Sequence, residues 1–166
     1  MVTIAPAGAG DIGVVQSLAD HVWRSHYPGI ISTAQIDYML EQGYAREALL
    51  RYVEAAGAGL ALARIDDEPV AFVAWRQSGS GAMNLEKLYV APAHHGKGVG
   101  RALIEHVADA ARRSGCRELT LNVNRNNESS IRAYEHCGFA IRERGDFPIG
   151  NGFVMEDYIM VRALAP

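Results

Sequence analysis

Apolar residues recur along the chain at two different spacings, and the spacing separates expected helices from expected strands. Ile12, Val15, Ala19 and Val22 follow one another at intervals of three or four, which predicts an amphipathic helix over about 10–25. In the segment 117–123 apolar and polar residues alternate instead, which predicts a strand. The whole pattern predicts strands at 2–5, 59–65, 70–77, 83–91, 117–123, 139–147 and 156–164, and helices at 10–25, 45–56, 98–114 and 127–137, with one more helix beginning after Ser32.

Local signals mark several boundaries of these elements. Ser32 and Gln35 have the S-x-x-Q spacing of a capping box, which favours a helix start at that point. Gly138 is placed to end the helix before it, because glycine readily adopts the left-handed conformation found after helix C-termini. The Gly/Asn-rich segment "PIGNG" (148–152) is expected to join the last two strands.

The order of the elements predicts an α/β domain of the α+β type. The order is β-αα(α)-β-β-β-α-β-α-β-β, in which three consecutive central strands are expected to be antiparallel. The β-α-β unit over 83–123 should be parallel, with a right-handed crossover. We therefore expect a mixed, mostly antiparallel central sheet of six to seven strands flanked by helices. No repeat or linker divides the 166 residues, so a single domain over 1–166 is predicted.

Composition and charge narrow the classes of partner. A net charge of -3 argues against nucleic acid as the main partner, because such domains usually carry a basic excess. No apolar stretch reaches the roughly 18 residues that span a bilayer, and the start lacks the features of a secretory signal. Cys116 and Cys137 have no metal-ligand spacing, which favours two buried free thiols in a cytoplasmic protein without a metal.

The segment "HHGKGVGR" (94–101) stands between an expected strand and an expected helix. Gly96, Gly98 and Gly100 allow tight turns and a close approach of main-chain N–H groups to a ligand. The helix start behind them and the charges of Lys97 and Arg101 favour an anion, so the segment is interpreted as a phosphate cradle. Its G-x-G-x-G spacing differs from the dinucleotide fingerprint and from the P-loop. From the glycines alone, a plain tight turn is an equally good interpretation.

Two blocks in sequence order resemble the GNAT superfamily of acyl-CoA-dependent N-acetyltransferases. The first is "LEKLYVAPAHHGKGVGRALIEHV" (85–107), in which the family's loop motif, Gln/Arg-x-x-Gly-x-Gly/Ala, is matched from His95 to Gly100. The second is "LNVNRNNESSIRAYEHCGF" (121–139), with Asn127, Ser130 and Tyr134 at the family's spacing. The departure is His95, which stands where the family usually has Gln or Arg. The resemblance is specific over about 83–140 and implies the GNAT fold and acetyl-CoA as cofactor.

The resemblance also implies which residues hold acetyl-CoA. The loop would bind its pyrophosphate, and the end of the preceding strand its pantetheine arm. The main-chain N–H of Val90, or of a nearby residue of that strand, is the expected donor to the oxyanion. Asn127 would reach the pantetheine or phosphate region, although its position also suits a simple helix N-cap. Arg125 and Arg132 are candidates for the 3′-phosphate, and equally for ordinary surface arginines. The full expected set is Leu88, Tyr89, Val90, His95, Gly96, Lys97, Gly98, Val99, Gly100, Arg101, Asn127, Ser130 and Tyr134.

Amide formation from a thioester needs a base for the ammonium and a proton for the leaving thiolate. Glu86 is the candidate base, because many GNAT enzymes place a catalytic glutamate on this strand. A solvated carboxylate beside Lys87 is the alternative for it. Tyr134 is the candidate acid, because it matches the family tyrosine that points at the coenzyme sulfur, and a phenol ordinarily has a pKa of about 10. Spacing alone would instead make Tyr134 a core aromatic.

The acceptor is predicted to be a small-molecule primary amine, polyamine-like or amino-acid-like. In GNAT folds the first helices and the last hairpin wall the acceptor pocket, and here these segments supply aromatic and acidic residues that suit a cation. They are Trp23, Tyr27, Tyr38, Phe147 and Phe153, with Asp37, Glu41, Asp146, Glu156 and Asp157. The residues singled out for substrate binding are Tyr27, Tyr38, Glu86 and Asn122. The alternatives are a protein or peptide amine as acceptor, or a non-catalytic acyl-CoA sensor, and a homodimer is compatible with the apolar last strand.

Overall fold

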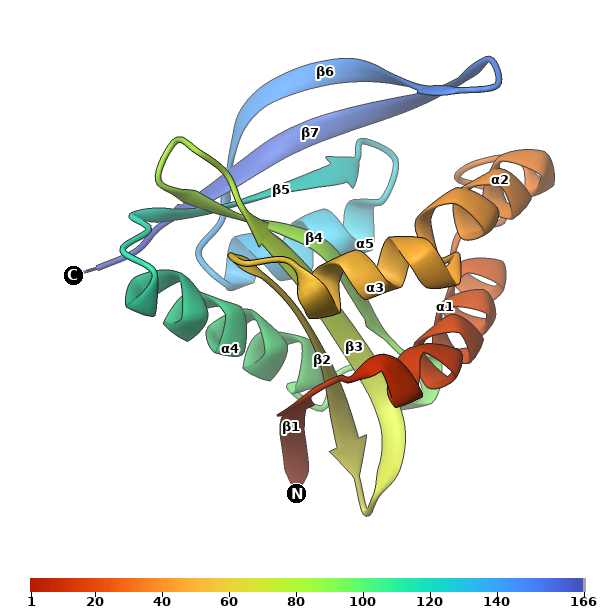
Figure 1. Cartoon of the computed structure of the whole chain (residues 1–166). Helices are drawn as coiled ribbons and strands as arrows, with labels where there is room; N and C mark the ends of the chain where they lie inside the picture. Colours follow the sequence, from red (N-terminus) through yellow and green to blue (C-terminus); the bar gives the residue numbers. More distant parts are fainter. Residues whose placement is uncertain (166) are drawn as a thin grey trace. The chain divides into compact units, whose positions relative to one another are not determined.

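The computed structural model describes residues 1–165 and contains seven strands and five α-helices over that range (Figure 1). The strands are β1 (Val2–Pro6), β2 (Ala58–Ile65), β3 (Glu68–Gln77), β4 (Ala82–Val90), β5 (Glu118–Asn124), β6 (Ala140–Gly150) and β7 (Phe153–Ala163). The helices are α1 (Ile12–His26), α2 (Thr33–Gly43), α3 (Arg46–Glu54), α4 (Val99–Arg113) and α5 (Glu128–His136), with single 3-10 turns η1 (Ala9–Asp11) and η2 (Pro92–His94). The strand order is β1-β2-β3-β4-β5-β7-β6, which confirms the predicted mixed sheet.

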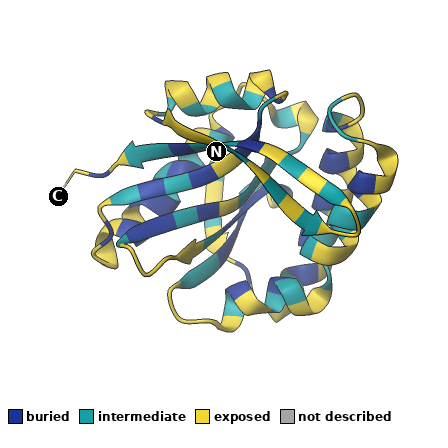
Figure 2. Ribbon diagram, turned by 90° about the horizontal axis from the view of Figure 1, so that it is seen from above, coloured by how far each residue is buried: buried dark blue, intermediate teal, exposed yellow. Residues whose placement is uncertain are grey.

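The described residues group into two compact units. Unit one comprises 1–76 and 85–107, and unit two comprises 77–84 and 108–165, so that β4 and α4 each contribute to both. The prediction of a single domain over the whole chain stays a prediction. Figure 2 shows how buried and exposed residues alternate along most helices and strands, as the sequence pattern predicts for amphipathic elements.

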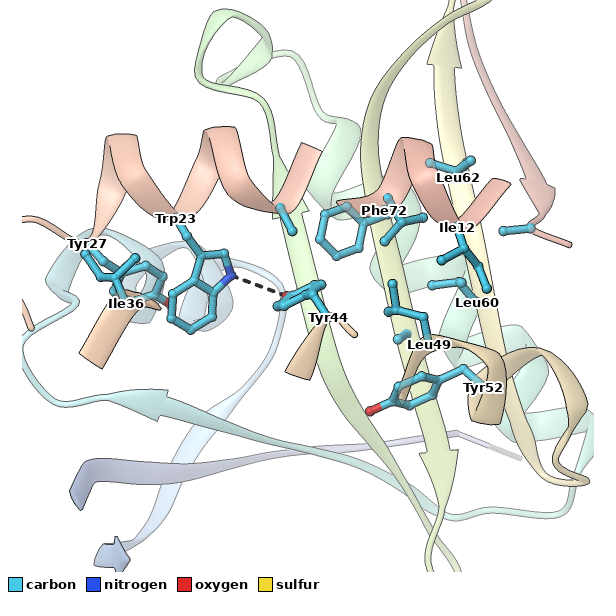
Figure 3. Packing of buried hydrophobic residues seen from close by; sticks show 14 residues of the cluster. Ile12, Trp23, Tyr27, Ile36, Tyr44, Leu49, Tyr52, Leu60, Leu62 and Phe72 are labelled. Atoms are coloured by element: carbon cyan, nitrogen blue, oxygen red, sulfur yellow. Dashed lines mark hydrogen bonds between the residues drawn. The ribbon is translucent and has the colours of Figure 1, made fainter. Parts of the chain in front are cut away.

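Unit one is built on strands β1, β2 and β3, which pair antiparallel, and the β2–β3 pairing confirms that part of the expected antiparallel order of the three central strands. Residues 60–63 of β2 and 70–74 of β3 are buried without interruption, so both faces of these strands are covered. The cluster of buried side chains in Figure 3 joins α1, α2 and α3 to one of these faces, with Leu62 and Phe72 from the strands and Ile12, Ile36 and Leu49 from the helices. At the start of α2, Ser32 Oγ accepts the N–H of Gln35 at 3.1 Å, as the capping pattern predicts.

Unit two is built on β5, β7 and β6, which pair antiparallel throughout. Residues Ala82–Asn84 of β4 pair with Glu118–Thr120 of β5 in parallel, which confirms the expected parallel β-α-β pairing. Only three residue pairs form this ladder, whereas seven join β5 to β7. Leu119, Leu121 and Met160 are buried on one face of unit two, and the opposite face of β5 carries the polar residues Thr120 and Asn122.

Two expectations about unit two need correction. The segment 148–152 was expected to be a loop, but β6 extends to Gly150 and β7 begins at Phe153, so the connection is only Asn151-Gly152. Both residues have positive φ, +54° and +78°, and Asn-Gly is the preferred pair for such two-residue hairpin turns. Both cysteines are free, but only Cys116 is buried, because Cys137 follows α5, a helix with no buried residue.

Among the described residues, no helix is both long enough and apolar enough to cross a membrane.

Candidate active site

The glycine-containing loop follows β4 in unit one. After Val90 the chain makes the single turn η2, and His95 Nε2 then lies 2.8 Å from the carbonyl oxygen of Val90. Because a carbonyl only accepts, the His95 ring carries its proton on Nε2 when this bond is made. The residue that departs from the family pattern therefore fastens the start of the loop to the end of β4.

Only two of the three loop glycines are required by backbone conformation. Gly96 and Gly98 have φ of +76° and +80°, a region that other residues adopt only with strain. A Cβ added at either position would meet no atom within 4 Å, so the requirement is conformational and the space around both is open. Gly100 lies within α4, where a Cβ would make an ordinary contact with Val90. The expectation that all three glycines shape the turn is thus met by Gly96 and Gly98.

This loop fits an anionic group such as the pyrophosphate of acetyl-CoA. Its residues from His95 to Gly98 are exposed, and α4 begins directly behind them at Val99. The first N–H groups of a helix have no partner within the helix and attract anions. Lys97 and Arg101 are also exposed and add positive charge to the same segment.

Glu86 on β4 lies within a cluster of side chains of unit one. The hydroxyl of Tyr52 from α3 donates to Glu86 Oε1 at 2.7 Å, and Arg76 Nε of β3 lies 4.0 Å from the same oxygen. The Arg76 guanidinium also stacks 4.9 Å from the centre of the Tyr52 ring. Glu86 is an exposed residue, but its side chain is only 27% exposed. Part of the exposed surface of Glu86 therefore belongs to its main chain. Glu86 is therefore a partly exposed carboxylate with specific partners, and its role as the base stays a prediction.

Lys87, the next residue of β4, is largely enclosed. Its Nζ lies 4.5 Å from the centre of the Tyr44 ring and 5.8 Å from that of Tyr52. Burial lowers the pKa of Lys87 to about 8, Glu86 opposes this shift, and Arg76 adds to it. Burial also raises the pKa of Tyr52 well above its ordinary value, and the hydrogen bond to Glu86 raises it further, so Tyr52 remains a proton donor to Glu86. The cluster of Tyr44, Tyr52, Arg76, Glu86 and Lys87 is called the Glu86 cluster below.

Replacing Lys87 by methionine is expected to stabilise the protein at pH 7 by about 1–2 kcal/mol. The pKa difference from 10.5 to about 8 corresponds to a cost of about 3 kcal/mol for the charged form, and loss of the ring contacts offsets part of the gain. Because the folded pKa is the lower one, the unfolded chain binds more protons between about pH 8 and 10.5. The destabilisation by Lys87 is therefore full below pH 8 and disappears as the pH rises to about 10.5.

Urea unfolding of both proteins at pH 7 and pH 10 measures this difference. Lys97→Met, at the only other lysine of the sequence, is the matched control, and its exposed position predicts a change below about 0.5 kcal/mol. A Lys87→Met protein less stable than wild type at pH 7 would show that the ring contacts outweigh the burial cost.

In unit two, the candidate residues lie on and before α5. Tyr134 is half-buried, and its ring meets the buried Phe139 edge-on at 5.7 Å between centroids. Asn127 is 4% exposed and holds the N-cap position, yet its side chain accepts no capping hydrogen bond. Asn127 thus has the position that the simple N-cap interpretation predicts, but its side chain does not make the hydrogen bond of an N-cap. Ser130 is half-buried one turn into the helix.

The two arginines suggested for the 3′-phosphate have partners within unit two. Arg125 has a side chain only 13% exposed, and its guanidinium donates to the carbonyl of Gly145 and to Asp146, at 3.2 and 2.9 Å. These bonds give Arg125 a structural role between β5 and the β6–β7 hairpin. Arg132 is an exposed arginine 3.9 Å from Glu128 on the same helix, as the surface interpretation predicts.

The residues suggested for substrate binding differ widely in exposure. Tyr27 and Trp23 are buried in the core of unit one, stacked at 4.3 Å, and the Tyr27 hydroxyl lies 3.1 Å from that of Tyr89. Tyr38 is half-buried on α2, and Asn122 is exposed on β5. Leu88, Tyr89 and Val90 are half-buried and Val99 is buried. Among these, only Asn122 is exposed, and the roles of all of them stay predictions.

Sequence reasoning missed the partners of Glu86. Tyr44, Tyr52 and Arg76 belong to no motif, and each is distant from Glu86 in sequence. The available signal was weak, because Tyr52 stands among both charged and apolar residues of α3. A hollow of about 560 Å³ lies elsewhere in unit one, along α1 and Pro69, and none of the candidate residues lines it.

Comparisons with known proteins show the family of this chain. The model of the acetyltransferase (GNAT) family matches residues 16–139, which is well over half of the chain. Spermidine N(1)-acetyltransferase of Thermoplasma acidophilum is 25% identical over 150 residues, covering 88% of this chain and 90% of that protein. Streptothricin acetyltransferase of Streptomyces lavendulae is 44% identical over 71 residues, which is 43% of this chain and only 35% of that protein.

A solved structure supports the same fold over nearly the whole chain. The PaiA N-acetyltransferase of Thermoplasma acidophilum, in complex with coenzyme A, superposes with a TM-score of 0.85 at 22% identity, covering 98% of this chain and 99% of that one. The chain therefore belongs to the GNAT acetyltransferase family. It is an N-acetyltransferase with the GNAT fold, and acetyl-CoA is its cofactor.

Proposed function

We propose that this enzyme transfers an acetyl group from acetyl-CoA to a primary amine of a small molecule, polyamine-like or amino-acid-like. The amine attacks directly, with both substrates bound at the same time. The observation that carries the proposal is the position of Glu86 on β4, held by the Tyr52 hydroxyl at 2.7 Å. A carboxylate fixed within reach of the acceptor can take a proton from its ammonium group.

Each candidate side chain has a distinct task in this reaction. Glu86 takes the proton from the acceptor ammonium, directly or through one water, which leaves a neutral nucleophile. Tyr52 donates to Oε1 and fixes the carboxylate, and its raised pKa keeps the proton on its own oxygen. Tyr134 donates its phenolic proton to the leaving sulfur. The main-chain N–H of Val90 is the candidate donor to the developing oxyanion.

The loop after β4 is the candidate holder of the cofactor. The main-chain N–H groups around Gly96 and Gly98 and the start of α4 would bind the pyrophosphate, with Lys97 and Arg101 adding charge. His95 contributes by fixing the Val90 carbonyl. The bound cofactor supplies an acetyl group that is activated as a thioester.

A small amine as acceptor is supported by two observations. The relative that aligns over 88% of this chain is named for spermidine. The β6–β7 hairpin carries Asp146, Glu156 and the half-buried Phe147, residue types that attract ammonium groups. Arg76 and Lys87 beside Glu86 are both cationic. They disfavour an acceptor that carries a second ammonium group close to its reacting amine.

The experiment is thiol release from acetyl-CoA by the purified chain with a panel of acceptors. The panel contains spermidine, 1,4-diaminobutane, butylamine, an amino acid and a lysine-containing peptide. We expect amine-dependent release with at least one of the small amines. Release with the peptide alone would move the proposal to a protein acceptor. Coenzyme A binding without release for any acceptor would support a sensor instead.

A further inference from the structure

Asp157 of β7 is a buried carboxylate that the proposed reaction does not use. It is 5% exposed, and it lies in the ladder between Asn124 of β5 and Gly145 of β6. Its Oδ1 has no hydrogen-bond partner among the described residues. A buried carboxylate oxygen without a donor is costly to a fold, and such groups are uncommon unless a ligand or a function uses them.

The neighbouring polar groups of unit two are engaged elsewhere. Asn124 Oδ1 accepts the main-chain N–H of Asn126 at 2.9 Å, which completes the turn after β5. The Arg125 guanidinium donates to the main-chain carbonyl of Asp157 at 3.4 Å and forms its ion pair with Asp146. The adjacent Glu156 is exposed and, by strand alternation, lies on the other face. Neither cation nor amide from these positions satisfies Oδ1.

Asn122 is the residue that connects Asp157 to the surface. Its side chain donates to the Asp157 carboxylate, and its pairing with Ile159 places it on the same face as Asp157. Burial raises the pKa of Asp157, whereas the Asn122 bond and Arg125 lower it, so the carboxylate is only partly compensated. Because Asn122 is exposed, a ligand that contacts it lies beside Asp157.

An aromatic ring stands on the other side of the carboxylate. A side chain at Gly145, the ladder partner of Asp157, would overlap the ring of Phe147. The ring thus occupies the space that Gly145 leaves empty, beside the ladder position of Asp157. An ammonium group next to Oδ1 would also contact the face of an aromatic ring, which adds to its binding.

We propose that Asp157, oriented by Asn122 and flanked by Phe147, binds a protonated amino group of the acceptor that does not itself react. The inference rests on the proposed function, because it names the substrate class as a diamine or polyamine. The carboxylate accepts an N–H of the ammonium at Oδ1, and the ion pair compensates the charge that the fold leaves unbalanced.

The test is calorimetric binding of 1,4-diaminobutane and of butylamine, with and without saturating coenzyme A. We expect wild type to bind the diamine at least about 10-fold more tightly than the monoamine, and Asp157→Asn to lose about 30-fold in diamine affinity with little change for butylamine. Asn122→Ala should lose less, about 3- to 10-fold, because the carboxylate remains. Glu135→Gln removes an exposed carboxylate of α5 in the same unit, which has no proposed contact with the acceptor, and should leave both affinities unchanged.

Thermal unfolding separates a binding role from a structural one. Removing an uncompensated buried charge should raise the unfolding temperature of Asp157→Asn while amine binding falls. An unchanged diamine affinity in this variant, or equal losses for both amines, would overturn the inference. Because binding is read directly, failure of the inference is distinct from failure of the proposed function, which would appear as no thiol release with any acceptor.

Discussion

Tyr134→Phe is expected to lower kcat about 100-fold while the KM for acetyl-CoA changes by less than about threefold. Phenylalanine keeps the ring that meets Phe139 at 5.7 Å, so the packing of α5 is preserved and only the phenolic oxygen is lost. Without a proton donor the thiolate leaves unprotonated, which raises the barrier of the step in which the C–S bond breaks. Thiol release at saturating amine measures kcat, and circular dichroism checks the fold.

The control for Tyr134 is Tyr158→Phe. Tyr158 is a half-buried tyrosine of β7 in the same unit and has no proposed role in the reaction, so its kcat should stay within about twofold of wild type. The acidity of the buffer offers a second check. Because a buffer acid can protonate the leaving thiolate, it should raise the kcat of Tyr134→Phe more than the kcat of wild type. If Tyr134→Phe keeps full kcat, the proton reaches the sulfur from another donor, and the resemblance-based role of Tyr134 is wrong.

Hydrophobic spacing predicted the fold well because each element buries a stripe or an alternate row of residues. The helix at 98–114 and the strand at 117–123, for example, differ from α4 and β5 by one residue at each end. The last hairpin was predicted less well, because "PIGNG" contains more residues typical of turns than the turn itself uses. Only Asn151-Gly152 forms the turn, while Pro148 and Gly150 lie within an edge strand where proline is tolerated.

In the candidate site, too, features that are contiguous in sequence could be predicted, and contacts between residues distant in sequence could not. The loop could be predicted because its glycines, its charges and the helix start are contiguous in sequence. The partners of Glu86 could not, because Tyr52 reaches it from 34 residues away through the packing of α3 on β2. Asp157 and Asn122 meet only through the register of β5 with β7, and strand register between distant segments is not encoded in any short motif.

Glu86→Gln is expected to lower kcat/KM for the amine about 100-fold at pH 7. Glutamine keeps the shape of the side chain and can still accept the Tyr52 hydrogen bond, but it cannot take a proton. Only the small neutral fraction of the free amine then reacts, and this fraction grows tenfold with each pH unit below the amine pKa. The deficit should therefore narrow to less than about fivefold at pH 9.5, and a pH profile of kcat/KM for both proteins measures it.

Tyr52→Phe distinguishes loss of the base from loss of its positioning. This variant keeps the carboxylate but removes the hydrogen bond that holds Oε1. A decrease of about 10-fold in kcat/KM for the amine is therefore expected, and the shape of the wild-type pH profile should be retained. Lys87 complicates the alkaline limb, since its pKa of about 8 means that it loses its charge beside Glu86 in the same range. Measuring Glu86→Gln also in the Lys87→Met background removes that titration. If the deficit of Glu86→Gln stays constant from pH 7 to 9.5 in that background, Glu86 orients the acceptor and the amine loses its proton elsewhere.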